Sequence, residues 1–105
     1  MMDRRPQQQI RLDLNNPVFQ RQLFNLPKND QRSILNTLRK LAEMTWQQVY
    51  SDNGLKWELI LSQKGPGDNK LYSFRISRGF RGVAYRDGLW LRLLSLHPDH
   101  DSAYR

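Results

Sequence analysis

The chain has 105 residues, of which 38% are hydrophobic and 10% aromatic, and this is enough for one folded domain but too little for a second core. It has no cysteine, which excludes disulfides and thiolate chemistry, and none of its apolar runs is long enough to cross a membrane. Lys and Arg number 17 against 10 for Asp and Glu, so the formal net charge is +7 and a polyanionic partner is favoured.

The chain begins with a polar segment, MMDRRPQQQ, which we expect to form a flexible extension (residues 1–9) of a single domain spanning residues 1–105. No apolar segment follows its basic residues, so it does not resemble a secretory signal, and a cytoplasmic protein is expected. Ile10, Leu12 and Leu14 then alternate with polar residues, which predicts a half-buried strand.

Two amphipathic helices are predicted after this strand. Asn16 and Pro17 have the N-cap and first-turn positions of the first helix, and Pro27 ends it. Residues 28–45 have the spacing of a second helix. The apolar positions are Val18, Phe19, Leu23 and Leu26 in the first helix and Ile34, Leu35, Leu38, Leu41 and Ala42 in the second.

Capping signals mark the second helix and the segment after it. The N-cap of the second helix is expected at Asn29 or Asp30. Thr45 and Gln48 have the spacing of a capping box, which predicts a short helical turn. Trp46, in this turn, is expected to pack at the edge of the core.

The remainder of the chain has the pattern of strands joined by turns. Residues 62–70, SQKGPGDNK, have the composition of a loop, and Asp87 and Gly88 form a two-residue hairpin signal. The strand segments are 55–61, 71–77, 81–86 and 89–96. We therefore expect an α+β fold of order β-α-α-β-β-β, with two N-terminal helices packed on one face of a small antiparallel β-sheet.

Basic residues gather in the predicted sheet. Asp87 is the only acidic residue between positions 70 and 92, a stretch that contains six basic ones. Arg75 alternates away from the apolar positions of its strand and Arg81 begins the next strand, so both guanidinium groups are expected on the face that the helices leave open. Arg also suits phosphate better than Lys does. A one-residue change in register would move Arg81 to the other face.

The chain ends in LHPDHDSAYR, which contains both of its histidines. Imidazole titrates near neutral pH and can move a proton, while guanidinium groups stabilise charge that develops on phosphate. Metal-independent RNA cleavage needs a base for the ribose 2′-hydroxyl, cations for the phosphate and an acid for the departing 5′-oxygen. The candidate proton carriers are His97, His100 and Tyr104, and the candidate phosphate ligands are Arg75 and Arg81.

Two simpler interpretations of this tail stay open. His97 and His100 with Asp99 and Asp101 are side chains that bind metals, but zinc pairs on a helix are usually spaced i, i+4, and Pro98 interrupts a regular helix. We therefore expect no metal site and no cofactor. The other interpretation is a solvated polar turn with an aspartate as its N-cap.

Three runs near the C-terminus, LYSFRIS, FRGVAYRDG and LWLRLLSLHPDHDSAY, resemble the last three strands and tail of the RelE/ParE toxin superfamily of bacterial toxin-antitoxin systems. The helical run LPKNDQRSILNTLRKL is similar to that family's two-helix hairpin. The resemblance implies a compact toxin whose RelE-like branch cuts mRNA in the ribosomal A site without a metal ion. It also implies a cognate antitoxin, which charge complementarity predicts to be acidic.

The resemblance also implies roles for individual residues. Arg81 in FRGVAY matches the family's active-site arginine, and Arg75 matches a basic residue one strand earlier. His100 matches a tail histidine of the YafQ-like branch, and Tyr104 matches the terminal aromatic residue. We expect His100 to be the general base and Tyr104 a positioning group or alternative proton carrier, with His97 a lesser candidate. Which of the three is the acid and which the base stays open.

Other positions match the family less closely. Trp57 and Glu58 lie where some members have a contributing acid or base, and Ser73 is a departure because some RelE-like members have lysine there. The basic residues that we expect to bind RNA are Lys56, Lys70, Arg78, Arg86 and Arg92.

Two other functions stay open for the same fold. ParE-type members poison DNA gyrase and perform no RNA chemistry, and a non-catalytic member would only bind RNA or an antitoxin. The combination of His100 and Tyr104 with Arg81 favours the ribonuclease, because ParE-like chains generally lack it.

Overall fold

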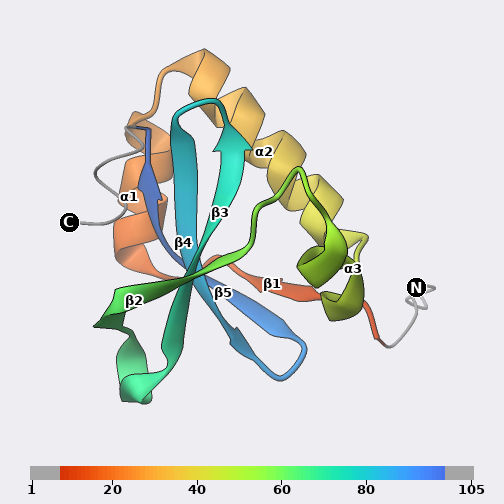
Figure 1. The fold of residues 1–105 in the computed structure, drawn as a ribbon. Coiled ribbons are helices and arrows are strands. Elements are labelled where there is room, and N and C mark those ends of the chain that lie inside the picture. Colours follow the sequence, from red (N-terminus) through yellow and green to blue (C-terminus); the bar gives the residue numbers. More distant parts are fainter. Residues whose placement is uncertain (1–7, 99–105) are drawn as a thin grey trace, which may run out of the picture.

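The chain folds into helices and strands in the order β-α-α-α-β-β-β-β (Figure 1), and the computed structural model describes residues 8–98. Within this range the helices are α1 (Pro17–Asn25), α2 (Lys28–Ala42) and α3 (Trp46–Ser51), and the strands are β1 (Arg11–Asp13), β2 (Glu58–Lys64), β3 (Lys70–Ser77), β4 (Phe80–Asp87) and β5 (Trp90–His97). The predicted α+β class is confirmed. All four strand segments predicted after the helices are present, so the predicted order β-α-α-β-β-β was one strand short. It also lacked α3, which was predicted only as a short helical turn.

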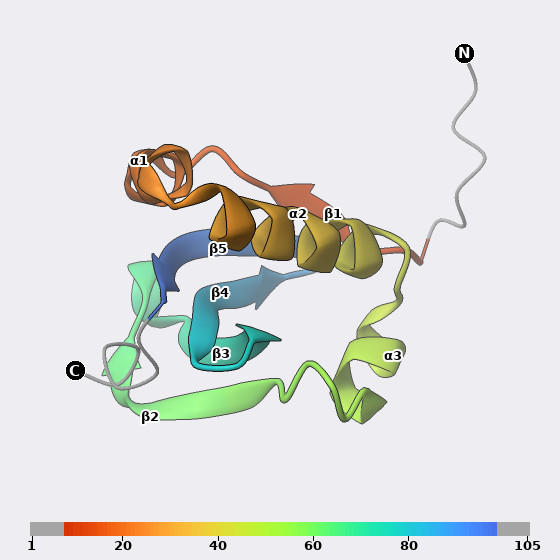
Figure 2. The ribbon, with the colours of Figure 1, turned by 90° about the horizontal axis from the view of Figure 1, so that it is seen from above.

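The strands form one sheet in the order β1-β5-β4-β3-β2. Strands β2 to β5 pair antiparallel, but β1 pairs with β5 in parallel, so the prediction of a purely antiparallel sheet is wrong at this edge. The chain leaves β1 through three helices and returns through the other strands to β5, and a long connection of this kind allows parallel pairing. Figure 2 shows α1 and α2 lying together beside β1 and β5.

Local capping groups set the start of two helices. The Asn16 side chain accepts hydrogen bonds from the backbone N–H groups of Val18 and Phe19 and so caps α1, as predicted. Thr45 and Gln48 form the predicted capping box at the start of α3. These two helix starts therefore follow directly from the sequence.

Helix α2 begins earlier than predicted. Pro27 precedes its first residue, and no side chain at this position makes a capping hydrogen bond, so the predicted cap at Asn29 or Asp30 is wrong. Proline has no N–H group and its fixed φ suits the entry to a helix. Asp30 instead lies in the first turn, where its negative charge interacts favourably with the helix dipole.

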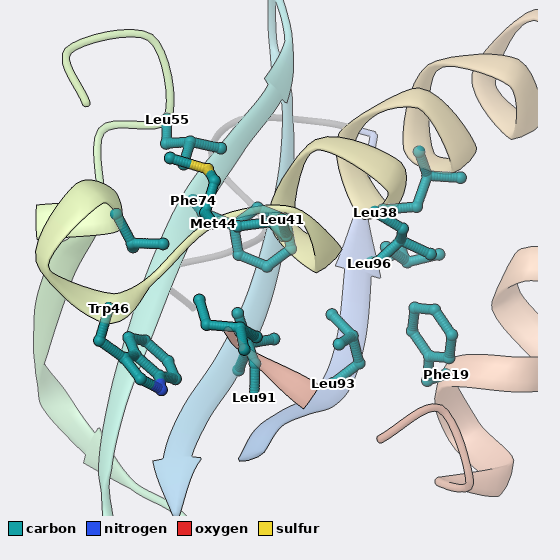
Figure 3. Close-up of a cluster of buried hydrophobic side chains, with 14 of the residues drawn as sticks. Phe19, Leu38, Leu41, Met44, Trp46, Leu55, Phe74, Leu91, Leu93 and Leu96 are labelled. Atoms are coloured by element: carbon teal, nitrogen blue, oxygen red, sulfur yellow. The ribbon is translucent and has the colours of Figure 1, made fainter. Parts of the chain in front are cut away.

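The main core lies between the helices and one face of the sheet (Figure 3). Side chains from α1, α2, α3 and the strands interlock there, and several of them have no exposed surface at all. Its largest members include Phe19, Leu41, Trp46, Phe74, Leu91 and Leu93. Trp46 is 4% exposed and packs inside this core, deeper than the core edge at which it was predicted.

Two apolar residues of the predicted helix stripes lie outside this core. Leu35 is 56% exposed and Val18 is 49% exposed. The residues of α2 that face the sheet have the spacing i, i+3, i+4 and i+7. Leu35 comes one residue after the first of them and therefore lies on another face of the helix. The buried residues of α2 are Ile34, Thr37, Leu38 and Leu41.

Backbone geometry explains where the strands depart from the predicted boundaries. The strand predicted at 55–61 begins only at Glu58, because Lys56 has a positive φ of 48° that interrupts extended structure. At the last hairpin, Asp87 still pairs with Trp90, so the two-residue turn lies one position later than predicted. Gly88 in this turn has a φ of 61°, which glycine adopts without steric strain.

Gly82 in β4 has no room for a side chain. A Cβ atom there would lie 2.3 Å from Cζ of Phe74, whose ring is fully buried. We expect Gly82→Ala to lower the free energy of unfolding by about 3 kcal/mol, since overpacking a rigid core forces side chains and backbone to move. Denaturant unfolding monitored by fluorescence measures this change. Adding Phe74→Leu to the variant provides space and should restore part of the loss, and an additive effect of the two substitutions would contradict the clash.

Among residues 8–98, every helix is too short or too polar to cross a lipid bilayer.

Candidate functional site

Three of the predicted site residues lie in one line across neighbouring strands. Arg75 on β3 pairs with Arg81 on β4, and Arg81 pairs with His97 on β5. Residues paired in this way point to the same face of a sheet, with Cβ atoms about 4.5–5.5 Å apart. We call this set the Arg75–Arg81–His97 row.

The row lies on the sheet face opposite the main core, which we call the second face. Phe74 belongs to the main core and Ile76 packs against it, so Arg75 between them points the other way. Val83, two residues after Arg81, belongs to a small separate cluster of apolar side chains on this face. The two arginines are therefore direct cross-strand neighbours, as the strand pattern predicted.

His97 reaches the second face because of a β-bulge in β5. Ala84 pairs with Leu93, but the next residue back, Val83, pairs with Ser95, so Leu94 is an extra residue on this strand. A bulge of this kind changes which face the following side chains occupy. Without it, His97 would point to the main core, so the bulge is what places the imidazole beside Arg81.

The environment of His97 favours a neutral ring. The side chain is partly buried, and this burial lowers the pKa of the imidazole below its usual value. Its Nε2 atom lies 2.8 Å from Oγ of Ser95. A neutral imidazole has one nitrogen that can accept a proton, so His97 has the protonation state that a general base needs at pH 7.

Arg75 and Arg81 place two positive charges directly opposite each other. Like charges in this arrangement destabilise a sheet, and an anion bound between them offsets the repulsion. The backbone N–H of Arg75 donates to the carbonyl oxygen of Leu55 at 2.6 Å, which fixes this residue against the segment before β2. Both arginines are partly exposed, so the row suits an anionic group that approaches the second face.

Arg92 lies elsewhere on the sheet and already contacts acidic side chains. Its Nη1 donates to Oδ2 of Asp13 at 2.6 Å, and its Nε donates to Oδ2 of Asp87 at 3.0 Å. A hydrogen bond from the backbone of Asn15, together with the one from Arg92, lowers the pKa of Asp13. Two carboxylates therefore offset much of the charge that Arg92 was predicted to offer to RNA.

Arg86 packs against α3 on the main-core side of the sheet. Its Nη1 donates to the hydroxyl oxygen of Tyr50 at 2.7 Å, and its guanidinium lies over the ring of Trp46, 4.9 Å from the ring centre. Its cross-strand partner is Leu91, a core residue. The structure therefore separates Arg86 from the Arg75–Arg81–His97 row.

The other basic residues predicted to bind RNA are all exposed. Lys56 precedes β2, Lys70 begins β3, and Arg78 lies in the turn between β3 and β4. Arg78 follows Arg75 closely and precedes Arg81, so it is the one of these three that lies nearest to the row in the chain.

His100 and Tyr104, predicted as proton carriers, lie outside the described residues, and so do Asp99 and Asp101 of the alternative metal site. Within residues 8–98, no three His, Asp or Glu side chains lie close enough together to hold a metal ion.

A second line of residues runs beside the first. Glu58 on β2 pairs with Ser73, Ser73 pairs with Val83, and Val83 pairs with Ser95. Glu58 therefore lies one strand away from the arginine pair, at the exposed edge of the sheet. Trp57 is the other residue that matches the family less closely. Its ring stacks on that of Tyr72, with 4.9 Å between the ring centres, and it packs against the main core.

Sequence reasoning missed Ser95. The signal was present in the run SLH, because residues two apart on a strand share a face and a hydroxyl there can reach an imidazole.

The fold resembles that of a protein of solved structure. A chain in the crystal structure of the archaeal RelE–RelB complex from Pyrococcus horikoshii aligns with 86% of this chain and 92% of its own length, with a TM-score of 0.57 and 20% sequence identity. No protein-family model and no curated protein matches the sequence. The likeness shows that this chain has a RelE-like fold.

Proposed function

We propose that this chain is the toxin of a type II toxin-antitoxin system and acts as a metal-independent, ribosome-dependent mRNA endoribonuclease that inhibits translation. The observation that carries the proposal is the Arg75–Arg81–His97 row on a RelE-like fold. The row combines two phosphate-binding cations with a neutral imidazole, and these are two of the three groups that RNA cleavage requires.

In the proposed reaction, His97 removes the proton of a ribose 2′-hydroxyl. The 2′-oxygen then bonds to the adjacent phosphorus, and Arg75 and Arg81 stabilise the negative charge that develops on the phosphate oxygens. The bond from phosphorus to the 5′-oxygen breaks, and that oxygen takes a proton from an acid. The sequence favoured His100 as the general base and Tyr104 as a positioning group or alternative proton carrier; with His97 as the base, we propose that His100 or Tyr104 supplies this proton. The products are a 2′,3′-cyclic phosphate and a 5′-hydroxyl.

The proposed partners are mRNA in the ribosomal A site and a cognate acidic antitoxin. The net charge of +7 favours both an RNA surface and an acidic protein. The structural neighbour was solved as a RelE–RelB complex. We propose that the antitoxin covers the second face and so blocks the row, and that the protein works in the cytoplasm, where its substrate is.

The test is to add purified protein to programmed ribosomes in the presence of a chelator and to map the mRNA ends by primer extension. We expect new ends within the A-site codon from the parent protein and none from a His100→Ala, Tyr104→Ala double variant. Gyrase supercoiling is assayed in parallel. Absence of new ends from folded protein, with inhibition of gyrase, would replace this proposal with a ParE-type function.

A further inference from the structure

We propose that Trp90 is a base-binding residue: its ring stacks on a base of the single-stranded RNA whose phosphates bind the Arg75–Arg81–His97 row. The inference rests on the proposed function, because the row must bind the same strand. RNA binding can be measured without cleavage, so the two proposals fail by different results.

Trp90 lies on the second face, at the end of the sheet away from the row. It comes directly before the core residue Leu91 at the start of β5, so its side chain points away from the main core. Its partner on β4 is Asp87, six residues after Arg81. At about 3.3 Å per residue, Trp90 is therefore about 20 Å from Arg81 along the sheet. A few nucleotides of an extended single strand span this distance.

The ring of Trp90 is both exposed and held in place. The residue is 39% exposed, although it lies in a paired strand. The guanidinium of Arg92 lies over the ring, 5.4 Å from its centre, and Arg92 is itself fixed by Asp13 and Asp87. Among residues 8–98, no other aromatic ring stacks on Trp90. A fixed ring loses little freedom on binding, and every base has a π-face that can stack on it.

The charges around Trp90 suit a base rather than a phosphate. Asp13 and Asp87 both contact Arg92. Arg11 on β1 is the exposed cross-strand partner of Trp90. These two acidic and two basic residues balance each other, so this end of the second face has no net charge, and an acidic protein segment gains little from it.

The surface between the row and Trp90 is apolar. Val83 and Tyr85 follow Arg81 on the same face of β4, and both belong to the small cluster on this side of the sheet. Cations at one end, apolar side chains in the middle and an exposed indole at the other end match a single strand of RNA. Its phosphates bind the cations, and its uncharged bases pack on aromatic rings.

The test is binding of a fluorescein-labelled RNA oligonucleotide whose 2′-hydroxyls are methylated, so that it cannot be cut. Anisotropy at several salt concentrations gives the Kd and its salt dependence. We expect Trp90→Ala to raise the Kd about 5- to 150-fold, the usual effect of losing one base–aromatic stack, and to keep the salt slope, because no phosphate contact is lost. Trp90→Phe should keep most of the affinity. Arg81→Ala should make the salt slope shallower.

Two controls separate stacking from a general loss of binding. Phe24→Ala removes a ring that is 73% exposed, from α1 on the main-core side of the sheet, and should change neither the Kd nor its salt slope. In the RNA, the base is removed at one position at a time. At one position, loss of the base should weaken binding to the parent protein and have no further effect on Trp90→Ala.

Three results would overturn the proposal. They are a Kd that Trp90→Ala leaves unchanged, base removals that affect the parent and Trp90→Ala equally at every position, and a parent protein that does not bind the oligonucleotide. Poly-glutamate is titrated in parallel. If Trp90→Ala weakens its binding and leaves RNA binding unchanged, this surface takes an acidic protein instead. The proposed ribonuclease fails by a separate result, the absence of new mRNA ends with the parent protein.

Discussion

His97→Gln is expected to lower the rate of mRNA cleavage by about 10²–10⁴-fold, the usual contribution of one acid-base group. Glutamine keeps a polar side chain of similar size next to Ser95 and Arg81 but cannot take a proton at neutral pH. Burial lowers the pKa of His97, so the ring of the parent protein is neutral at pH 7. Cleavage by the parent should therefore rise with pH through a midpoint below about 6.5 and then level off. Single-turnover rates across pH measure both expectations.

The variant to compare is His100→Gln, which changes the other histidine of the chain, itself a candidate proton carrier. If His100→Gln loses the acid limb and His97→Gln keeps it, the base is the tail histidine that the family resemblance implies, and our assignment to His97 is wrong. Stability must be measured at each pH. The lowered pKa means that the folded chain binds fewer protons than the unfolded chain, so stability also falls as pH drops through this range.

The parts of the fold that the sequence predicted depend on short-range signals. The Asn16 cap and the Thr45–Gln48 capping box each join residues at most three positions apart. The placement of Arg75 beside Arg81 also follows from a short connection, because Gly79, with a φ of 74°, allows a tight turn between β3 and β4. Features that depend on residues only a few positions apart could therefore be predicted from the sequence.

The position of His97 could not be predicted in the same way. Leu91 and Leu93 are core residues, and simple alternation continues this face through Ser95 and His97. The bulge at Leu94 reverses the faces, and it depends on the pairing of β5 with β4 rather than on any turn residue in the sequence. The pairing of β3 with β4 also shifts register just beyond Arg75 and Arg81, but this shift leaves the two arginines paired, whereas the shift in β5 changes the face of His97.

The RNA-binding residues were difficult to predict because some of the arginines contact residues far away in the sequence. Arg92 and Asp13 are 79 residues apart, and they meet because β1 returns to pair with β5. Arg86 contacts Tyr50 of α3, a helix that the predicted element order did not contain. Charge in the sequence identified a basic chain, but only the topology shows that Arg92 contacts Asp13 and Arg86 contacts Tyr50, whereas Arg75 and Arg81 lie opposite each other on β3 and β4.

Arg81→Ala is expected to lower cleavage by about 10²–10³-fold, the usual effect of removing one group that stabilises transition-state charge. Arg81 lies at the centre of the row, between Arg75 and His97, so it is the cation of the row that lies directly opposite the proposed base. Arg81→Lys should retain part of the rate, because an ammonium supplies the charge without the two-pronged geometry of guanidinium. Single-turnover cleavage of ribosome-bound mRNA measures these effects on the chemical step.

The matched control is Arg39→Ala, which removes the same charge from an exposed position on α2. It should weaken RNA association slightly through the lower net charge and leave the single-turnover rate unchanged. If Arg81→Ala and Arg39→Ala both reduce association and neither changes the chemical step, the basic residues act only as a docking surface, and the row has no catalytic role. A loss confined to the chemical step of Arg81→Ala requires a cation at that position, because net charge is the same in the two variants.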